Sequence, residues 1–125
     1  MILLVRVALA LGFVIDGCVG LVALFAPQLS APLFDVPIRD TLIGGLAGGE
    51  FLVVALVYAL AFSDPRRYRA LLWLCALDQF FAVVLPAFGI AHGALPATWK
   101  IVAPIPLSAL LVLIFVAGAT RIRRA

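Results

Sequence analysis

Apolar residues run through the chain in four long stretches, and short segments between them hold most of the charged residues and prolines. A helix of about 20 apolar residues, rising about 1.5 Å per residue, crosses a hydrocarbon core of roughly 30 Å. The four stretches match that length and cover about 2–26, 42–62, 70–90 and 102–120. The pattern therefore predicts an all-α fold, a four-helix transmembrane bundle that forms a single integral membrane domain over residues 1–125.

Composition supports this interpretation. Hydrophobic residues make up 66% of the chain and charged residues 12%, whereas charged residues are about 25% of an average soluble protein. We expect the first stretch to be retained as a helix, because it is longer than the apolar part of a secretion signal and holds Arg6 and Asp16. The alternative is a cleaved leader that ends near residues 29–31.

The basic residues predict the orientation in the membrane. Positive residues favour the cytoplasmic side, so we expect both termini and the 63–69 turn in the cytoplasm, and loops 27–41 and 91–101 outside. This predicts a multi-pass protein of the cell inner membrane. The net charge of +3 then needs no nucleic-acid partner to explain it. Seven of the nine basic residues lie on the expected cytoplasmic side: Arg6, Arg66, Arg67, Arg69, Arg121, Arg123 and Arg124.

Small residues indicate how the helices pack. Gly12, Asp16 and Gly20 recur every four residues, so they share one helix face that another helix can approach closely. In the third stretch, Cys75 and Asp78 lie on one stripe, with Gln79 beside it, and the stripe continues to Ala82 and Leu85. The second stretch is glycine-rich, which favours close helix packing over a phosphate cradle, since a cradle needs a strand before it. Its glycines are Gly44, Gly45, Gly48 and Gly49.

Three carboxylates, Asp16, Glu50 and Asp78, lie inside predicted spans. Such groups cost at least a few kcal/mol in lipid and usually mark a functional site. Counted from the cytoplasmic ends, Asp16 lies about 21 Å deep, Glu50 about 18 Å and Asp78 about 12 Å, with Arg6 about 6 Å deep. Depth alone therefore predicts that Asp16 pairs with Glu50 and that Arg6 pairs with Asp78.

The two predicted pairs differ in chemistry. An arginine beside a carboxylate is mainly structural, because removing either partner leaves a buried charge. Two facing carboxyl groups in a medium of low dielectric cannot both ionise readily, so one is expected to hold a proton and to form an acid–base pair with the other. Alternatively, both are neutral and only join helices by hydrogen bonds.

We expect no metal and no cofactor. Three carboxylates supply too few oxygen ligands for Mg²⁺ or Ca²⁺, and no histidine lies at their depth, which disfavours zinc and haem. The single histidine, His92, falls in an expected outer loop and is interpreted mainly as a surface side chain. The segment 27–41 holds three prolines and is interpreted as a plain loop, or as a segment that lies on the membrane surface or over the mouth of the bundle.

The order of these features resembles the DoxX-like family of small four-helix bacterial membrane proteins. The resemblance rests on Leu4-Val5-Arg6, Gly12-Phe13, Gly17 and Gly48-Gly49-Glu50, and on the short basic turn before the third span. It implies a four-helix architecture and an association with redox or quinone-linked systems. Asp16 and Asp78 are not part of the family pattern.

Two hypotheses follow for function. In the first, Asp16, Glu50 and Asp78 form an intramembrane site for a lipophilic small molecule, a quinone or an isoprenoid. The site either binds it or acts by acid–base catalysis, such as isomerisation, epoxide opening or cyclisation. In the second, the chain is an accessory or assembly subunit of a membrane redox complex, or a homo-oligomer, with its glycine faces used for assembly. A proton-coupled transporter is a third hypothesis, although the two halves show no inverted repeat.

Overall fold

A computed structural model describes residues 1–123. Its four long helices lie within two residues of the predicted limits, which confirms the all-α four-helix bundle. Arg124, one of the basic residues expected at the cytoplasmic side, lies outside the described residues. The elements in order are α1 (Ile2–Phe25), the 3-10 turn η1 (Pro27–Leu29), α2 (Ser30–Phe34), α3 (Thr41–Ser63), α4 (Leu71–Ala91), α5 (Trp99–Val102) and α6 (Pro104–Arg121).

Side-chain caps define where α3 begins and where the turn before α4 begins. The Asp40 carboxylate accepts hydrogen bonds from the backbone N–H groups of Leu42 and Ile43, two donors that the helix itself cannot satisfy. Asp64 accepts in the same way from the N–H groups of Arg66 and Arg67 in the turn that leads to α4. Short polar side chains favour these positions, because their oxygen atoms reach the free N–H groups of the following turn.

Four helices are long and apolar enough to cross a membrane: Ile2–Phe25, Thr41–Ser63, Leu71–Ala91, and the combined segment Trp99–Arg121. Large apolar side chains cover their outward faces; Leu3, Leu46 and Leu113, for example, are all exposed. A soluble protein rarely exposes so much apolar surface. The chain is therefore a small multi-pass membrane protein.

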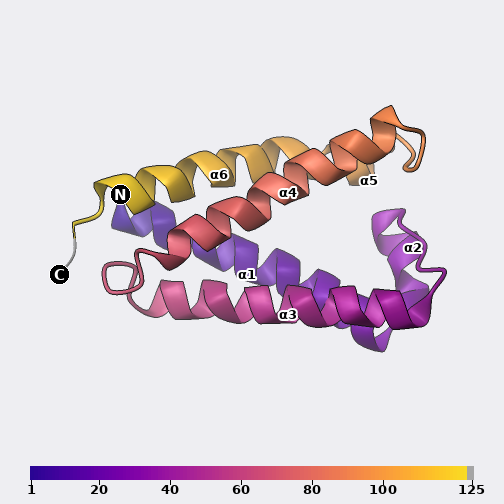
Figure 1. Ribbon diagram of the computed structural model, residues 1–125, viewed down its shortest axis with the longest axis horizontal. Helices are drawn as coiled ribbons and strands as arrows, with labels where there is room; N and C mark the ends of the chain where they lie inside the picture. The colour runs from indigo at the N-terminus through magenta and orange to yellow at the C-terminus, as the bar shows by residue number, and fades with distance from the viewer. Residues whose placement is uncertain (124–125) are drawn as a thin grey trace.

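The long helices form two pairs. α1 packs most extensively against α3, and α4 against α6, whereas contact between the pairs is sparser. Figure 1 shows the pairs meeting near the termini and diverging toward α2 and α5. We call these two ends the terminus end and the far end. At the terminus end, the Arg69 guanidinium donates a hydrogen bond of 3.0 Å to the Ile122 carbonyl, which joins the α3–α4 turn to the end of α6.

The apolar core lies at the terminus end. Its buried residues come from the first half of α1, the second half of α3, the first half of α4 and the second half of α6, and these four segments are adjacent in an up-and-down bundle. Tyr58 and Phe115 are its largest members, with ring centroids 5.8 Å apart. The full set is Val5, Ala8, Leu9, Tyr58, Ala61, Leu72, Cys75, Ala76, Leu111, Phe115, Ala119 and Ile122.

Toward the far end, α1 and α3 touch through glycine backbones. A Cβ atom on Gly48 would come within 2.9 Å of the Gly20 carbonyl oxygen and of the Leu24 nitrogen, and a Cβ on Gly20 would meet the Gly48 oxygen at the same distance. Neither helix could keep this position with a larger residue. By contrast, a Cβ on Gly49 would meet nothing within 4 Å, so only part of the glycine-rich run serves close packing.

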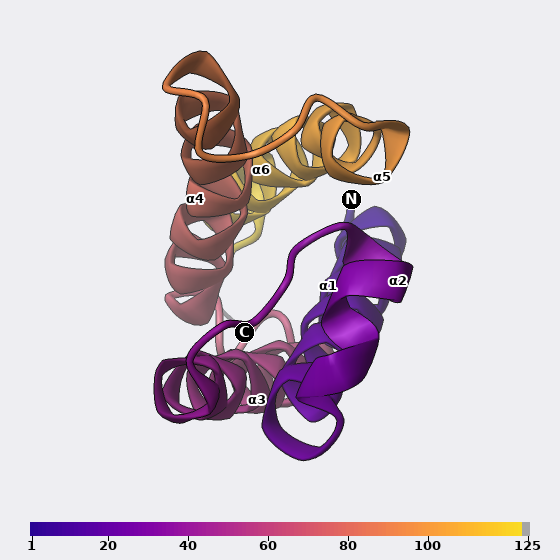
Figure 2. The same ribbon diagram turned by 90° about the vertical axis from the view of Figure 1, so that its right-hand side faces the viewer.

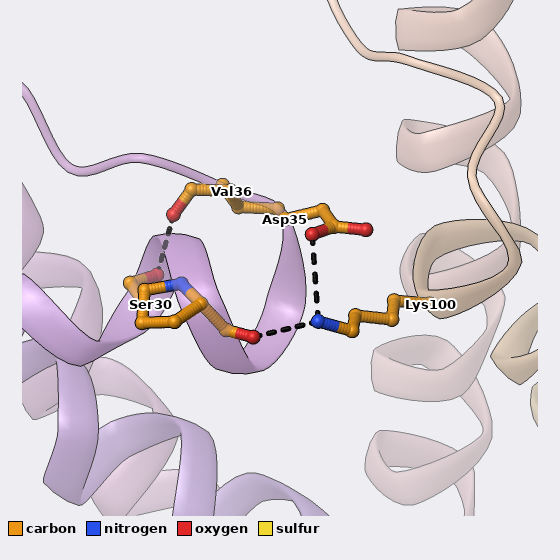
Figure 3. Close-up of polar contacts among 5 residues, drawn as sticks. Ser30, Asp35, Val36 and Lys100 are labelled. Carbon is orange, nitrogen blue, oxygen red and sulfur yellow. Dashed lines mark hydrogen bonds and ion pairs between the residues drawn. The ribbon is translucent and has the colours of Figure 1, made fainter.

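At the far end, polar contacts join the two outer loops. Lys100 of α5 donates a 2.6 Å hydrogen bond to the Pro32 carbonyl and lies 3.6 Å from the Asp35 carboxylate, as Figure 3 shows. The Ser30 hydroxyl donates to the Val36 carbonyl and holds the bend after α2. Segment 27–41 thus consists of η1, α2 and an extended stretch before α3, and α2 contacts α5 across the mouth of the bundle, which Figure 2 shows end-on.

Candidate functional site

Asp16 is the most deeply buried carboxylate in the part of the chain that the structure describes. Only 4% of its surface is exposed, although it is an ionisable residue in the middle of α1. Gly12 and Gly20, one turn before and after it, are also buried, and both lie against α3. The small residues let α3 approach, and this burial confirms the face predicted from their spacing. The Asp16 carboxyl group lies close enough to Asp78 of α4 for direct interaction.

Tyr58 of α3 joins this pair. Its ring packs over Gly12, where any side chain would collide with it. Its hydroxyl donates a hydrogen bond of 2.7 Å to the Asp78 Oδ2 atom and lies 3.4 Å from the Cys75 carbonyl oxygen. The glycine on α1 therefore creates the space that places a phenol beside the carboxylate of α4.

Gln79 completes the arrangement. Its Nε2 atom donates to the Tyr58 hydroxyl at 2.8 Å and to Asp78 Oδ2 at 3.1 Å. The side chain is 1% exposed, so these bonds form inside the bundle. Asp78 is half-buried, so of these four side chains it is the one that is partly exposed at the surface. We call Asp16, Tyr58, Asp78 and Gln79 the polar cluster.

Two acceptor atoms of the cluster remain unused. Asp16 Oδ2 and Gln79 Oε1 are fully buried and find no hydrogen-bond partner among residues 1–123. A buried acceptor without a partner costs about 1–3 kcal/mol, and native proteins keep few of them. The cluster is therefore an intramembrane group of two carboxyls, a phenol and an amide with spare capacity to accept hydrogen bonds.

The predicted pairing of Asp16 with Glu50 is wrong. Glu50 is exposed on the outside of α3. Gly48, two residues earlier, faces α1, and two residues turn a helix by about 200°, so Glu50 lies on the opposite side. Depth along the span placed Glu50 at the right level, but it did not determine the direction in which the side chain points.

The predicted pairing of Arg6 with Asp78 is also wrong. The Arg6 side chain is exposed, and its guanidinium lies over the Phe62 ring at 5.8 Å from the centroid. Asp78 takes its hydrogen bonds from Tyr58 and Gln79 instead. Within residues 1–123, the ion pair between Lys100 and Asp35 is the single salt bridge.

Other candidate groups lie apart from the cluster. His92 is exposed after the end of α4 and stacks on Phe88, with 4.0 Å between ring centroids. Within the described chain, no three His, Cys, Asp or Glu side chains are placed to hold a metal ion. Cys18 is an exposed free thiol and Cys75 a buried one.

An apolar groove of about 310 Å³ lies beside the cluster. It runs along the α1–α3 pair and is lined by Leu9, Ala10, Phe13, Ala59 and Phe62. These residues neighbour Gly12 and Tyr58 in sequence, but they form the outer side of the pair, whereas Tyr58 points inward to Asp78. The groove is therefore a lipid-facing hollow next to the polar cluster.

Sequence reasoning missed Tyr58. A signal was present, because Tyr58 carries a hydroxyl within an apolar span and is flanked at three-residue spacing by Ala55 and Ala61. Small residues one turn before and after a large one mark a helix face that packs closely, and all three residues are buried.

Comparisons of the chain with protein-family models, with curated proteins and with solved structures find no match. The geometry of the polar cluster is therefore the basis for assigning a function.

Proposed function

We propose that the polar cluster binds the polar end of a lipophilic molecule, a quinone or an isoprenoid, within the membrane. The observation that carries this proposal is the pair of fully buried, unpaired acceptors, Asp16 Oδ2 and Gln79 Oε1. A membrane protein keeps such groups where they serve a ligand or a proton pathway. The surroundings fit a lipophile, because the helices around the cluster expose apolar side chains along their whole length.

The two aspartates have different surroundings, which assigns them different roles. Asp78 accepts hydrogen bonds from Tyr58 and Gln79, whereas Asp16 is the more deeply buried of the two carboxyl groups. Asp16 faces Asp78, and two carboxyls this close do not both ionise readily in a medium of low dielectric. If the protein is an enzyme, Asp16 is thus the candidate acid and Asp78 the candidate base, in chemistry such as isomerisation, epoxide opening or cyclisation.

Ligand binding by the protein in lipid nanodiscs tests this proposal. We expect geranylgeraniol or a short-chain ubiquinol to bind, and Asp16→Asn, which changes one of the two unpaired acceptors, to weaken binding about tenfold, the equivalent of one hydrogen bond. Cys18→Ala, an exposed change on α1, serves as the control and should bind like the wild type. Circular dichroism and size-exclusion chromatography check that each variant is folded. Failure of both probes to bind the wild-type protein would remove the proposal.

Glu50 favours a second candidate, an accessory or assembly subunit of a membrane redox complex. Its carboxyl group is exposed about 14 Å from the start of the 23-residue helix α3, close to mid-span. A carboxylate facing lipid at that depth costs about 2.5–3.5 kcal/mol, and contact with another chain would offset that cost. The redox association is also what the resemblance to the DoxX-like family implies.

Native electrophoresis of membranes solubilised in mild detergent tests the second candidate. If the Glu50 face binds another chain, Glu50→Leu should abolish a higher-mass species, while Leu113→Ile, an exposed apolar change on α6, should leave it intact. A Glu50→Leu protein that migrates with the same partners as the wild type would contradict an assembly role for this face.

We also propose that the protein resides in the cell inner membrane with both termini in the cytoplasm. The five basic residues Arg66, Arg67, Arg69, Arg121 and Arg123 belong to the terminus end, and positive residues favour the cytoplasmic side. A reporter fused to the carboxyl terminus should read as cytoplasmic, and a periplasmic signal would reverse the orientation.

A further inference from the structure

Hydrogen-bond donors and acceptors in the polar cluster do not balance. Tyr58 uses its single hydroxyl proton on Asp78, and the Gln79 amide nitrogen donates to both Tyr58 and Asp78. Cys75, the remaining neighbour, offers its carbonyl oxygen as an acceptor, and its buried thiol, a weak donor, makes no hydrogen bond within residues 1–123. The strong donors of Tyr58 and Gln79 are therefore engaged, whereas Asp16 Oδ2 and Gln79 Oε1 have no partner among the described residues.

A proton on the aspartate pair does not remove this imbalance. One proton shared between Asp16 and Asp78 satisfies the contact between the two carboxyl groups. Gln79 Oε1 belongs to an amide, which can only accept at that atom. Exchanging the amide oxygen and nitrogen would point the oxygen at Asp78 and lose both bonds that Gln79 donates. The group missing from the cluster is therefore a donor.

We propose that the molecule bound by the cluster carries a hydroxyl group as its polar end, and that this hydroxyl donates its one proton to the buried, unpaired Oε1 atom of Gln79. This inference rests on the proposed function and narrows its ligand class. An isoprenoid alcohol or a quinol fits, since each donates a hydrogen bond. A quinone, an ether or an epoxide has only acceptor oxygens. Such a ligand would leave the unpaired acceptors of the cluster without a hydrogen-bond donor.

The route to the cluster starts at Asp78, its one half-buried member. α3 and α4 meet at the turn between them and diverge toward the far end, as Figures 1 and 2 show. Beyond Asp78, α4 exposes the apolar side chains of Phe81 and Leu85. We therefore place the apolar tail of the ligand against these exposed side chains of α4, in contact with lipid.

The test compares matched ligands with the wild-type protein in lipid nanodiscs. Geranylgeraniol is compared with geranylgeranyl methyl ether, and a short-chain ubiquinol with the corresponding ubiquinone. In a matched pair that binds, we expect the ligand with the hydroxyl group to bind about tenfold more tightly than the ligand without it. This factor corresponds to one such hydrogen bond. Preference within the first pair identifies an isoprenoid alcohol as the ligand class, and preference within the second identifies a quinol.

Gln79→Met provides the variant: it keeps the side-chain length and removes the unpaired oxygen, together with the two hydrogen bonds that the Gln79 nitrogen donates inside the cluster. The donor preference should fall to about threefold or less, while Cys18→Ala should retain the full preference. If the wild type binds the ether as tightly as the alcohol, or the quinone as tightly as the quinol, the inference that the ligand donates a hydrogen bond is wrong. The proposed site itself would not be contradicted by that result. Binding of none of the four probes would instead remove the site itself, so the two failures are distinguishable.

Discussion

The terminus end and the far end of this bundle are held together in different ways. At the terminus end, all four long helices contribute fully buried apolar side chains, including Leu9, Leu72 and Phe115. At the far end, α1 and α3 touch through Gly20 and Gly48, while the two helix pairs are joined by loop contacts such as Lys100 with Asp35. Packing over a large area tolerates little movement, whereas a few polar contacts at a surface tolerate much more.

The polar cluster lies at the junction between these two ends. Tyr58 and Cys75 belong to the apolar core, and Asp16 lies one turn beyond Gly12, where α1 leaves that core. A site at this position has one rigid side, which fixes the phenol and the carboxylates, and one side that can open. The difference between the ends suggests how a buried site could admit a lipid-sized molecule. Four predictions test this comparison.

The largest effect should come from the core of the terminus end. Phe115→Ala removes a fully buried ring that packs on Tyr58, and we expect it to lower the free energy of unfolding by about 3 kcal/mol. This is the lower end of the range for soluble cores, since in a membrane the side chain moves into lipid rather than water. Unfolding by sodium dodecyl sulfate in mixed micelles measures the loss. Leu113→Ala, at a lipid-facing position of α6, should change stability little.

The next effect concerns the glycine contact between α1 and α3. Gly48→Val should destabilise the protein by about 1–3 kcal/mol, because its Cβ would overlap backbone atoms that cannot move without separating the helices. Gly49→Val is the matched control, since the space beside Gly49 is open. The same unfolding assay applies. Equal losses in both variants would mean that the close approach contributes nothing specific.

A smaller effect should follow from removing one hydroxyl group in the cluster. Tyr58→Phe deletes the hydrogen bond to Asp78 Oδ2 and leaves that carboxylate with one donor, Gln79. We expect a loss of about 1–2 kcal/mol in unfolding free energy together with weaker ligand binding. Tyr68→Phe, in the turn before α4, should affect neither. Unchanged ligand binding in a stable Tyr58→Phe protein would show that the phenol has only a structural role.

The smallest effect on stability should come from the far end. Lys100→Met removes a surface ion pair and one hydrogen bond, so the unfolding free energy should fall by about 1 kcal/mol or less. Its effect on motion should be clearer: amide hydrogen exchange in 27–41 should accelerate, while exchange in the core of α6 should not change. If Lys100→Met changed amide exchange equally in 27–41 and in the core of α6, the contrast between the two ends would be contradicted.

The amino-acid sequence by itself determined the elements of this protein. Apolar length gave the four spans, because the hydrocarbon thickness admits few other solutions. Asp40 marks the start of α3 locally, because its carboxylate satisfies N–H donors that the helix cannot. The four-residue spacing of Gly12, Asp16 and Gly20 predicted the buried face of α1. All of these are local properties, decided within one helix or at its ends.

Only the tertiary structure decided which polar groups meet. The sequence indicated that Asp16 and Asp78 lie inside the membrane, but their partners depend on the rotation and crossing of the helices. α4 keeps Cys75 buried yet exposes Ala82 and Leu85 on the same predicted stripe, since the helix pairs diverge beyond Asp78. Successive side chains along an α-helix point in directions about 100° apart around its axis. Depth along a span placed Asp78 about 9 Å lower than Asp16, yet the crossing of the helices brings the two together, and the packing of Gly48 on Gly20 turns Glu50 away from the cluster.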